Sequence, residues 1–368
     1  MAGKSKKPAT PLHSRKVTDF EAKERLHVDV GPRCNNNCIF CMEEDRSGRA
    51  KRVGAITSKQ ILQILSANKF REEVIFVSGE PTLNPDLLDY VRHATREGFK
   101  SVGIISNGRR FAYMPYARAA VKRGLNLVII SIHGGNQRLH NGLTRTPGSF
   151  QEVTDGLRNL AQLKAQGYPL RIHTSTVLNK RNAKPEALDE LLDLLHPMVD
   201  QMVFNVMQPF GRGLAHFDRL MMQYTQAASA VGEFFARHEG EELPIYMVDI
   251  PHCTTEGKGI PDRSRGFVER YVRYQLECAG DETGVWKQAG ESSGGAPIRK
   301  ELLAAAREEQ LEGLEQKHRD HQEQAQKVRR EQCNLCAYSF VCDGVWRNYI
   351  DHFGWDEMQP VVKETDDD

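Results

Sequence analysis

The sequence contains no run of about 18 apolar residues, which is the length that a membrane-crossing helix needs. No transmembrane helix is therefore predicted. The N-terminal segment MAGKSKKPATPLHSRK is basic but has no apolar stretch, so it does not resemble a secretory signal. A cytoplasmic location is the resulting expectation.

An excess of charge of either sign is also missing. The 50 Lys and Arg residues are balanced by 49 Asp and Glu residues, which leaves a net charge of +1. A balance this even argues against a general nucleic-acid-binding protein. Hydrophobic residues make up 39% of the 368 residues and charged residues 27%, enough for a packed core under a well-solvated surface. The length suits one large domain with an extension.

Eight cysteines are present, and six of them fall into two tight groups. The groups are Cys34, Cys38 and Cys41, and Cys333, Cys336 and Cys342, while Cys253 and Cys278 stand apart. Cysteines only a few residues apart make poor disulfide partners but good joint ligands of one metal centre. In a cytoplasmic protein, such grouping indicates metal binding rather than disulfides.

Apolar strand patterns alternate with helical patterns over most of the chain. Strands are predicted at 26–30, 74–77, 102–105, 127–132, 170–178 and 202–207, and helices at 57–70, 86–97, 113–123, 149–166, 185–195 and 223–238. Six such pairs imply parallel strands joined by crossover helices in a sheet buried on both faces. The predicted fold class is α/β, a partial TIM-like (βα)6 barrel with its active-site groups at the C-terminal ends of the strands. The expected domains are a flexible basic tail at 1–24, the barrel at 25–240, and a cysteine-rich extension at 241–368.

The first cysteine group directly follows the first predicted strand. Residues 34–41 read C-N-N-N-C-I-F-C, a C-x3-C-x2-C spacing. Three thiolates are one fewer than a closed four-cysteine cluster or zinc site uses. The spacing therefore predicts a metal centre with one open coordination position, which is the arrangement of a reactive site.

This motif resembles that of the radical S-adenosylmethionine (SAM) superfamily, whose members carry C-x3-C-x-Φ-C after the first barrel strand. Phe40 occupies the aromatic Φ position. The resemblance implies a [4Fe–4S] cluster on Cys34, Cys38 and Cys41 whose open iron binds the amino and carboxylate groups of SAM. One-electron reduction would then cleave SAM to methionine and a 5′-deoxyadenosyl radical that abstracts hydrogen from the substrate. In such an enzyme the cofactor supplies the chemistry, and the protein supplies orientation and water exclusion.

Three further segments extend the resemblance. Residues 78–81 read S-G-E-P after the second strand and resemble the GGEP segment that contacts the SAM amino group, with Ser78 replacing the first glycine. Residues 106–108 read S-N-G after the third strand, and Ser131 ends the fourth, where relatives place a serine near SAM. The implied cofactor-binding residues are Phe40, Gly79, Glu80, Asn107 and Ser131. Arg145 and Asn179 are further candidates, whereas His133 and His140 are treated as ordinary polar positions.

The second group, at 333–342, has the spacing C-x2-C-x5-C. It resembles the core of the SPASM and twitch extensions, which hold auxiliary [4Fe–4S] clusters in radical SAM enzymes. SPASM proteins place a further cysteine where this chain has Trp346, so a single twitch-like cluster is expected on Cys333, Cys336 and Cys342. Cys253 is favoured over Cys278 as its fourth ligand. Zinc bound by the same four thiolates is the alternative.

The resemblance implies a radical SAM enzyme, with a peptide or protein as the leading substrate class. The alternative is a small molecule, such as a nucleotide or another metabolite, in cofactor or natural-product biosynthesis. A non-catalytic iron–sulfur or zinc protein is a third hypothesis, although an electron carrier would not need Glu80 and Ser131. RNA modification is disfavoured by the neutral charge balance. The expected partner is a reductant such as flavodoxin or ferredoxin, with no membrane or nucleic-acid partner, and no catalytic acid or base is identified.

Overall fold

The computed structural model describes residues 25–42, 57–265, 271–276, 286–288, 327–339, 342 and 344–362. For 271–276 and 286–288 the description covers the backbone alone. The expected tail at 1–24 and Cys278 lie outside the described residues.

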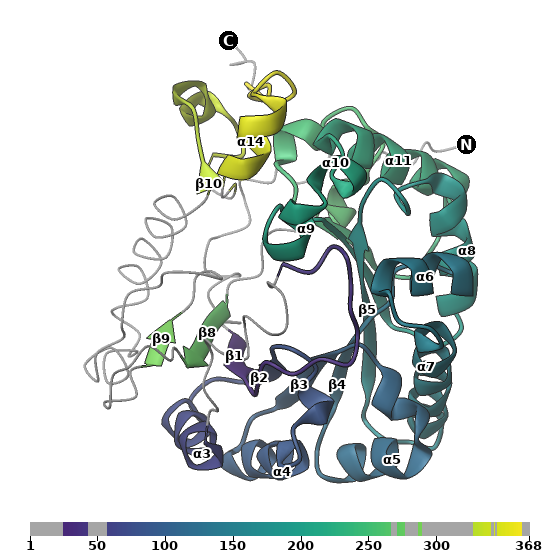
Figure 1. Cartoon of the computed structure of the whole chain (residues 1–368), viewed down its shortest axis with the longest axis vertical. Helices are drawn as coiled ribbons and strands as arrows, with labels where there is room; N and C mark the ends of the chain where they lie inside the picture. The colour runs from purple at the N-terminus through teal and green to yellow at the C-terminus, as the bar shows by residue number, and fades with distance from the viewer. Residues whose placement is uncertain are drawn as a thin grey trace, which may run out of the picture.

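A curved sheet built from seven parallel strands in chain order forms the body of the protein (Figure 1). Each strand pairs in parallel with the one before it. The strands are β1 (Arg25–Asp29), β2 (Glu73–Val77), β3 (Ser101–Ser106), β4 (Leu127–Ser131), β5 (Arg171–Leu178), β6 (Gln201–Val206) and β7 (Ile245–Val248). On the free side of β1 the sheet continues with β8 (Tyr271–Leu276), which is parallel, and β9 (Trp286–Gln288), which is antiparallel to β8. The predicted α/β barrel-like fold is confirmed.

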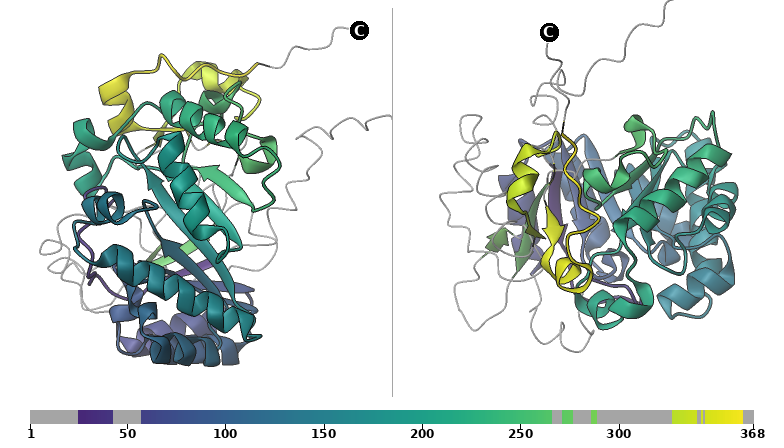
Figure 2. Two further views of the ribbon diagram at one scale, coloured as in Figure 1. Left: turned by 90° about the vertical axis from the view of Figure 1, so that its right-hand side faces the viewer. Right: turned by 90° about the horizontal axis from the view of Figure 1, so that it is seen from above.

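The crossover helices flank the sheet in chain order (Figures 1 and 2). They are α3 (Ser58–Ala67), α4 (Leu87–Glu97), α5 (Met114–Lys122), α7 (Ser149–Ala165), α8 (Pro185–Leu195) and α11 (Tyr224–Arg237). All six coincide with the predicted helices to within a few residues. Local signals explain the ends: Thr57 and Gln60 form a capping box at the start of α3, and Gly98 ends α4 in the left-handed conformation.

Several elements were not predicted, among them the sheet strands β7, β8 and β9 and the helix α6. Strand β7 lies beyond residue 240 and pairs with β6, so the barrel sheet extends into the segment expected to begin the extension. Its four residues, IYMV, are too few for a clear periodic signal. The short helix α6 (Gln137–Thr144) was also missed, because its sequence QRLHNGLT is mostly polar although His140, Leu143 and Thr144 are buried. The domain limits themselves stay a prediction.

The inner face of the sheet is polar at both ends and apolar in the middle. At the N-terminal end of the strands, Arg25 Nε lies 2.5 Å from Glu73, and the Ser101 and Arg171 side chains continue this network. The apolar middle layer consists of Ile75, Val77, Ile105, Leu127 and Ile129. At the C-terminal end the inward-facing residues are Asp29, Ser131, Ser175 and Asn205. The ionic and apolar layers close one end of the interior, so polar chemistry is available at the other.

The C-terminal segment packs on the end of the barrel that carries α9 (Gly211–Ala215), α10 (Phe217–Leu220) and α11 (Figures 1 and 2). Strands β10 (Lys327–Val328) and β11 (Val345–Trp346) form a small antiparallel ladder before α14 (Arg347–Phe353). The ring of Tyr349 stacks on Tyr224 at 4.1 Å between centroids. Glu357 accepts hydrogen bonds from the backbone N–H groups of Tyr224 and Thr225, which caps α11. Within the part of the chain described, no helix has both the length and the apolar composition to cross a bilayer.

Candidate functional site

The first cysteine group lies in a loop, residues 30–42, that leaves the C-terminal end of β1; we call it the cysteine loop. All three cysteines are partly exposed, and none is joined in a disulfide. Burial, and then the neighbouring Cys41 and Cys34, raise the pKa of the Cys38 thiol. Cys34 and Cys41 therefore lie within electrostatic range of Cys38.

The β2–α4 connection supports the start of the cysteine loop. The backbone N–H of Glu80 donates to the carbonyl of Arg33 at 2.7 Å. Gly79 has φ +55°, and a Cβ atom there would lie 2.4 Å from the Arg33 oxygen and 2.8 Å from that of Gly31. Ser78 also has a positive φ, 80°, in the position where the resembling motif has glycine. Gly79 is therefore required because the two backbones touch.

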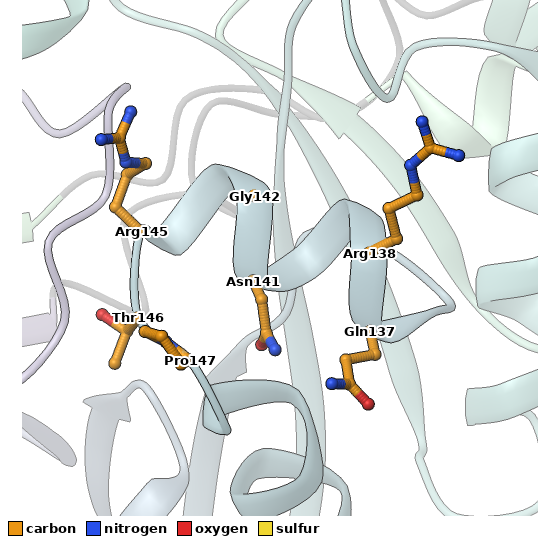
Figure 3. A pocket seen from close by; sticks show the side chains of 7 residues that line it. All are labelled: Gln137, Arg138, Asn141, Gly142, Arg145, Thr146 and Pro147. Carbon is orange, nitrogen blue, oxygen red and sulfur yellow. The ribbon is translucent and has the colours of Figure 1, made fainter.

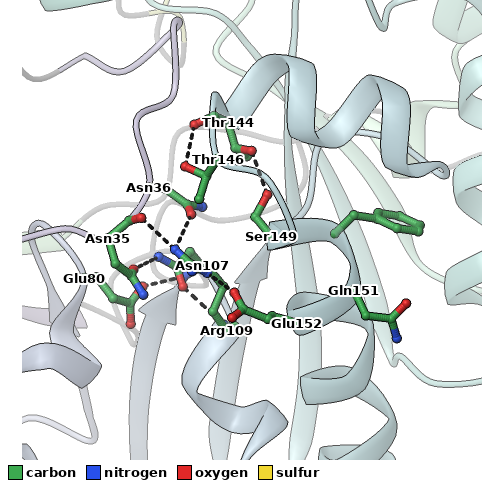
Figure 4. Close-up of polar contacts among 12 residues, drawn as sticks. Asn35, Asn36, Glu80, Asn107, Arg109, Thr144, Thr146, Ser149, Gln151 and Glu152 are labelled. Atoms are coloured by element: carbon green, nitrogen blue, oxygen red, sulfur yellow. Dashed lines mark hydrogen bonds and ion pairs between the residues drawn. The ribbon is translucent and has the colours of Figure 1, made fainter.

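Glu80 is buried and its carboxylate accepts hydrogen bonds on both oxygens. Figure 4 shows Glu80 beside Asn107. Oε1 accepts from the Thr82 N–H at 3.1 Å, the Thr82 hydroxyl at 2.6 Å and the Ser106 hydroxyl at 2.8 Å. Oε2 accepts from the Asn107 N–H at 2.6 Å, which leaves it an acceptor position for a further donor. Burial raises the pKa of Glu80 above its usual value, against the lowering effect of these bonds.

The loop after β3 holds the asparagines of the motif (Figure 4). The side-chain amide of Asn107 donates to Asn35 Oδ1 at 2.6 Å. Arg109 Nη1 donates to the Asn35 carbonyl at 2.6 Å and to Asn36 Oδ1 at 3.1 Å. The Asn36 N–H in turn donates to the Cys34 sulfur at 3.4 Å. Asn107, predicted to bind the cofactor, is thus placed against the cysteine loop.

Helix α6 holds the middle of the cysteine loop from the opposite side. The N–H groups of Asn37 and Ile39 donate to the carbonyls of Thr144 and Leu143 at 2.9 and 3.0 Å. The helix ends at Arg145, which is exposed and left-handed with φ 51°. A hollow of about 660 Å³ runs along α6, with Arg138 and Arg145 extending from one side and Gln137, Asn141, Thr146 and Pro147 on the other (Figure 3).

Helix α9 holds the end of the cysteine loop. The Cys41 carbonyl accepts from the N–H groups of Arg212 and Gly213 at 3.0 and 3.2 Å. The Arg212 guanidinium also donates to the Asn37 side chain. The three asparagines between Cys34 and Cys38 are therefore tied to the β3 loop and α9, a role that their identity alone did not reveal.

His133 and His140, which were expected to be ordinary polar positions, pack next to the cysteine motif through Phe40. Phe40 packs edge-on against the His133 ring at 4.5 Å, and His133 stacks on His140 at 5.8 Å. Each Nδ1 accepts a backbone N–H, His133 from Val177 and His140 from His133, so the ring proton is on Nε2. Burial lowers the pKa of His140 to about 4 and, with the nearby His140, lowers that of His133. Phe40 is therefore supported by a neutral histidine pair.

This pair makes stability depend on pH. An unfolded histidine takes up a proton near its ordinary pKa of 6.5, but His140 does so only near pH 4 when folded. Its contribution is full above pH 6.5 and is lost as the pH falls toward 4. We expect it to account for about 2 kcal/mol of the loss in unfolding free energy between pH 7 and 5. In urea unfolding, the unfolding free energy of a His140→Gln variant should change less between pH 7 and 5 than that of wild type, by about this amount. The control His196→Gln, at an exposed site, should behave like wild type. An equal change in His140→Gln and wild type would contradict this expectation.

The remaining predicted cofactor residues take different positions. Ser131 is partly exposed at the inner C-terminal end of β4, beside Ser175 of β5. Asn205 of β6 donates to the Ser175 hydroxyl at 2.7 Å. Neither Ser175 nor Asn205 was singled out from the sequence, although both alternate with buried residues along their strands. Asn179 is buried in a local turn, where its Oδ1 accepts from the Arg181 N–H, so its amide is engaged within the turn.

The structure brings Cys253 to the second cysteine group. Cys253 lies in a 3-10 helix (His252–Thr255) after β7, and Cys333 lies in another, Glu331–Leu335. Burial, and then Cys342, Cys336 and Cys333, raise the pKa of Cys253 to about 12. His252 stacks on Tyr338 at 5.1 Å, which joins the two segments. Cys253 therefore lies within electrostatic range of the three cysteines of the second group.

Aromatic packing links the two cysteine groups. Trp346 packs edge-on against Phe210 at 4.7 Å, and the Asn348 amide donates to the Pro209 carbonyl at 3.0 Å. Phe210 immediately precedes α9, which holds Cys41. The segment that follows Cys342 is therefore connected through α9 to Cys41, the last cysteine of the first group.

The donor sets fit iron–sulfur clusters by their chemistry. Thiolates are the usual protein ligands of such clusters, and no cysteine of either set is joined in a disulfide. Among the described residues, no three His, Cys, Asp or Glu side chains converge as ligands of a single ion would. Cluster ligands stand further apart, because each cysteine binds a different iron.

Comparisons with known proteins agree with this geometry. Residues 28–195 match the model of the Radical SAM superfamily. The chain is 26% identical over 252 residues to GTP 3',8-cyclase of Marinobacter nauticus, covering 67% of this chain and 69% of that protein. It is 27% identical over 173 residues to human Molybdenum cofactor biosynthesis protein 1, of which it spans only 25%.

Solved structures show the same fold. SuiB of Streptococcus suis, solved with its precursor peptide SuiA, superposes with a TM-score of 0.60 at 14% identity, covering 91% of this chain and 75% of SuiB. The enzyme anSMEcpe with bound AdoMet gives 0.55 at 14% identity, covering 88% of this chain and 89% of that one. At this identity the likeness concerns the fold alone. The family-model match, over residues 28–195, is therefore similarity to the Radical SAM superfamily across a little under half of this chain.

Proposed function

We propose that the chain is a radical SAM enzyme that binds a [4Fe–4S] cluster on Cys34, Cys38 and Cys41 and cleaves SAM reductively. The observation that carries the proposal is the convergence of independent elements on one loop at the C-terminal end of the sheet. A [4Fe–4S] cluster bound there would supply the electron that splits SAM into methionine and a 5′-deoxyadenosyl radical. The protein's part is to hold the cysteine loop and to orient SAM.

Glu80 is suited to the SAM ammonium group, because an acceptor position remains on Oε2 and its surroundings exclude water. Ser131 lies on the inner face of the neighbouring part of the sheet, where a hydroxyl can contact the ribose or carboxylate. Phe40 and Gly79 would act through the loop, Phe40 by packing on His133 and Gly79 by allowing the backbone contact.

For the substrate we propose a small molecule, in place of the peptide expected from the sequence. The sequence similarity that extends over two thirds of the chain is to a GTP cyclase, at 26% identity. The likeness to SuiB supports a peptide only through the fold, at 14% identity. The proposed class is therefore a nucleotide or another metabolite used in cofactor or natural-product biosynthesis.

Hydrogen transfer tests the substrate class directly. The anaerobically reconstituted, reduced enzyme would be given SAM with deuterium-labelled GTP, and separately with a pool of deuterium-labelled peptides. We expect a nucleotide or metabolite to place deuterium in 5′-deoxyadenosine, with GTP as the first probe. Transfer from peptide alone would overturn the small-molecule assignment and leave SAM cleavage intact.

We also propose an auxiliary [4Fe–4S] cluster on Cys253, Cys333, Cys336 and Cys342. Its support is the position of Cys253 among the other three thiols. A reductant such as flavodoxin or ferredoxin would serve the enzyme as electron donor, and the chain is proposed to act in the cytoplasm.

Cysteine replacement distinguishes the two candidate fourth ligands. Reconstituted wild type should hold about eight iron atoms per chain, since each cluster contains four. We expect Cys253→Ala to lower this to about four and Cys278→Ala to leave it unchanged. Iron, sulfide and zinc would be measured on the same samples. Loss of iron in Cys278→Ala alone would contradict the assignment, and about four irons with one zinc in wild type would replace the auxiliary cluster with a zinc site.

A further inference from the structure

Arg109 connects the cysteine loop to helix α7. Its side chain is only 15% exposed although it carries a full charge. Nε pairs with the Glu152 carboxylate of α7, while Nη1 donates to the Asn35 carbonyl at 2.6 Å and to Asn36 Oδ1 at 3.1 Å (Figure 4). One guanidinium therefore binds an acceptor on α7 and two acceptors on the cysteine loop at the same time, an arrangement that suits its planar fork of separated donors better than the compact ammonium group of lysine.

The backbone of Arg109 is itself fixed. Its N–H donates to Asn107 Oδ1 at 3.2 Å, and the Asn107 amide donates to Asn35 Oδ1 at 2.6 Å. Asn35, Asn107 and Arg109 thus form a closed set of hydrogen bonds. Glu152 holds the far end of the guanidinium from α7, an element that packs tightly on the 3-10 helix η3 (Arg109–Ala112).

The sulfur of Cys34 lies at the end of this chain of contacts. Arg109 holds the side chain of Asn36, and the N–H of Asn36 donates to the Cys34 sulfur at 3.4 Å. Hydrogen bonds to the cysteine sulfurs, and positive charge nearby, stabilise the more negative, reduced state of an iron–sulfur cluster. The guanidinium provides the charge and fixes the residue that provides the hydrogen bond.

We propose that Arg109, held by Glu152, is a positioning residue that raises the reduction potential of the SAM-binding cluster by holding the Asn36 N–H on Cys34. This inference rests on the proposed function, because it requires a cluster on the first cysteine group. Asn36 occupies an unspecified position of the cysteine motif, and neither Arg109 nor Glu152 lies in any of the sequence motifs. These three residues come into contact because the fold brings the β3 loop, α7 and the cysteine loop together.

The test is a potentiometric titration of the reconstituted full-length protein, with dithionite as reductant. The cluster is followed by the part of its EPR signal that changes when SAM is added, which separates it from the auxiliary cluster. In Arg109→Gln we expect the ratio of reduced to oxidised cluster at the wild-type midpoint to fall about tenfold, equivalent to about 59 mV for one electron. Asn36→Ala should change it in the same direction, and Arg109→Lys should fall between Arg109→Gln and wild type.

Arg158→Gln is the matched control. It removes an arginine from α7 that is exposed and pairs with Asp155 at 2.6 Å, away from the cysteine loop. Its cluster should titrate like wild type. Asn36→Ala carries the test if Arg109→Gln assembles no cluster, because it leaves the ion pair with Glu152 in place.

A midpoint unchanged in both Arg109→Gln and Asn36→Ala would overturn the inference. Failure of both to assemble the cluster, in protein that is folded by circular dichroism, would also overturn it, because the contacts would then serve assembly and not the potential. If wild type holds the cluster but does not cleave SAM, the proposed function fails while the titration remains a valid test of Arg109.

Discussion

Gly79→Ala is expected to remove most of the iron from the first cysteine group. The added Cβ would lie 2.4 Å from the Arg33 carbonyl oxygen and 2.8 Å from that of Gly31, and both atoms belong to the backbone of the cysteine loop. Neither can rotate away, so the loop must shift, and the alanine must also adopt φ +55°. We expect a loss of about 3 kcal/mol in unfolding free energy and less than about a third of the wild-type iron on this group.

Gly98→Ala separates the two causes. Gly98 has φ +96°, but no atom lies within 4 Å of a Cβ built there. This variant should therefore lose only the backbone contribution, about 1 kcal/mol, and keep its iron. Iron analysis and urea unfolding on both variants would decide the matter. Full iron in Gly79→Ala would show that the contact between the two backbones does not position the cysteine loop.

Glu80→Gln is expected to weaken SAM binding by about 10- to 100-fold, because an amide replaces the charged partner of an ammonium group. The effect should depend on pH. Burial raises the pKa of Glu80 in the folded protein, so folding favours the protonated carboxyl group. The stabilisation from the protonated group is complete below the ordinary glutamate pKa and is lost as the pH rises through the pKa of Glu80 in the folded protein. SAM binding favours the charged form, so wild-type affinity should rise with pH over this range, while the affinity of Glu80→Gln should not.

Glu73→Gln provides the comparison for Glu80. Glu73 is also largely buried, and it pairs with Arg25 at 2.5 Å at the opposite end of the same strand. Its replacement should lower stability but leave SAM affinity unchanged in calorimetric titrations of the reconstituted protein. Equal SAM affinity of Glu80→Gln and wild type would remove Glu80 from the binding site.

The fold was predictable because its signals are local. The six predicted strand–helix pairs between β1 and α11 have clear apolar periods and recognisable ends, such as the Thr57 capping box and Gly98. Strand β7 was missed because four residues carry no period, and its pairing with β6 is a tertiary fact. Helix α6 was missed because only a few of its residues are buried, and it is held in place by the cysteine loop rather than by its own composition.

The site was predictable only where residue type limits chemistry. Three closely spaced cysteines and a Gly-Glu pair after a strand have few alternative uses, so these residues could be named from the sequence. Arg109, Asn36, Glu152 and the pair His133 and His140 are ordinary residue types whose importance depends on what they touch. Cys253 could be named from the sequence only by resemblance, because its approach to the second cysteine group depends on the path of the chain after β7.

The most direct test of the central claim is SAM cleavage. Wild-type protein and a Cys34/Cys38/Cys41→Ala variant would be reconstituted without oxygen, reduced with dithionite, and assayed for 5′-deoxyadenosine by mass spectrometry. The account predicts 5′-deoxyadenosine from wild type and none from the variant. No product from wild-type protein that holds a full complement of iron and sulfide, or equal product from the variant, would contradict it.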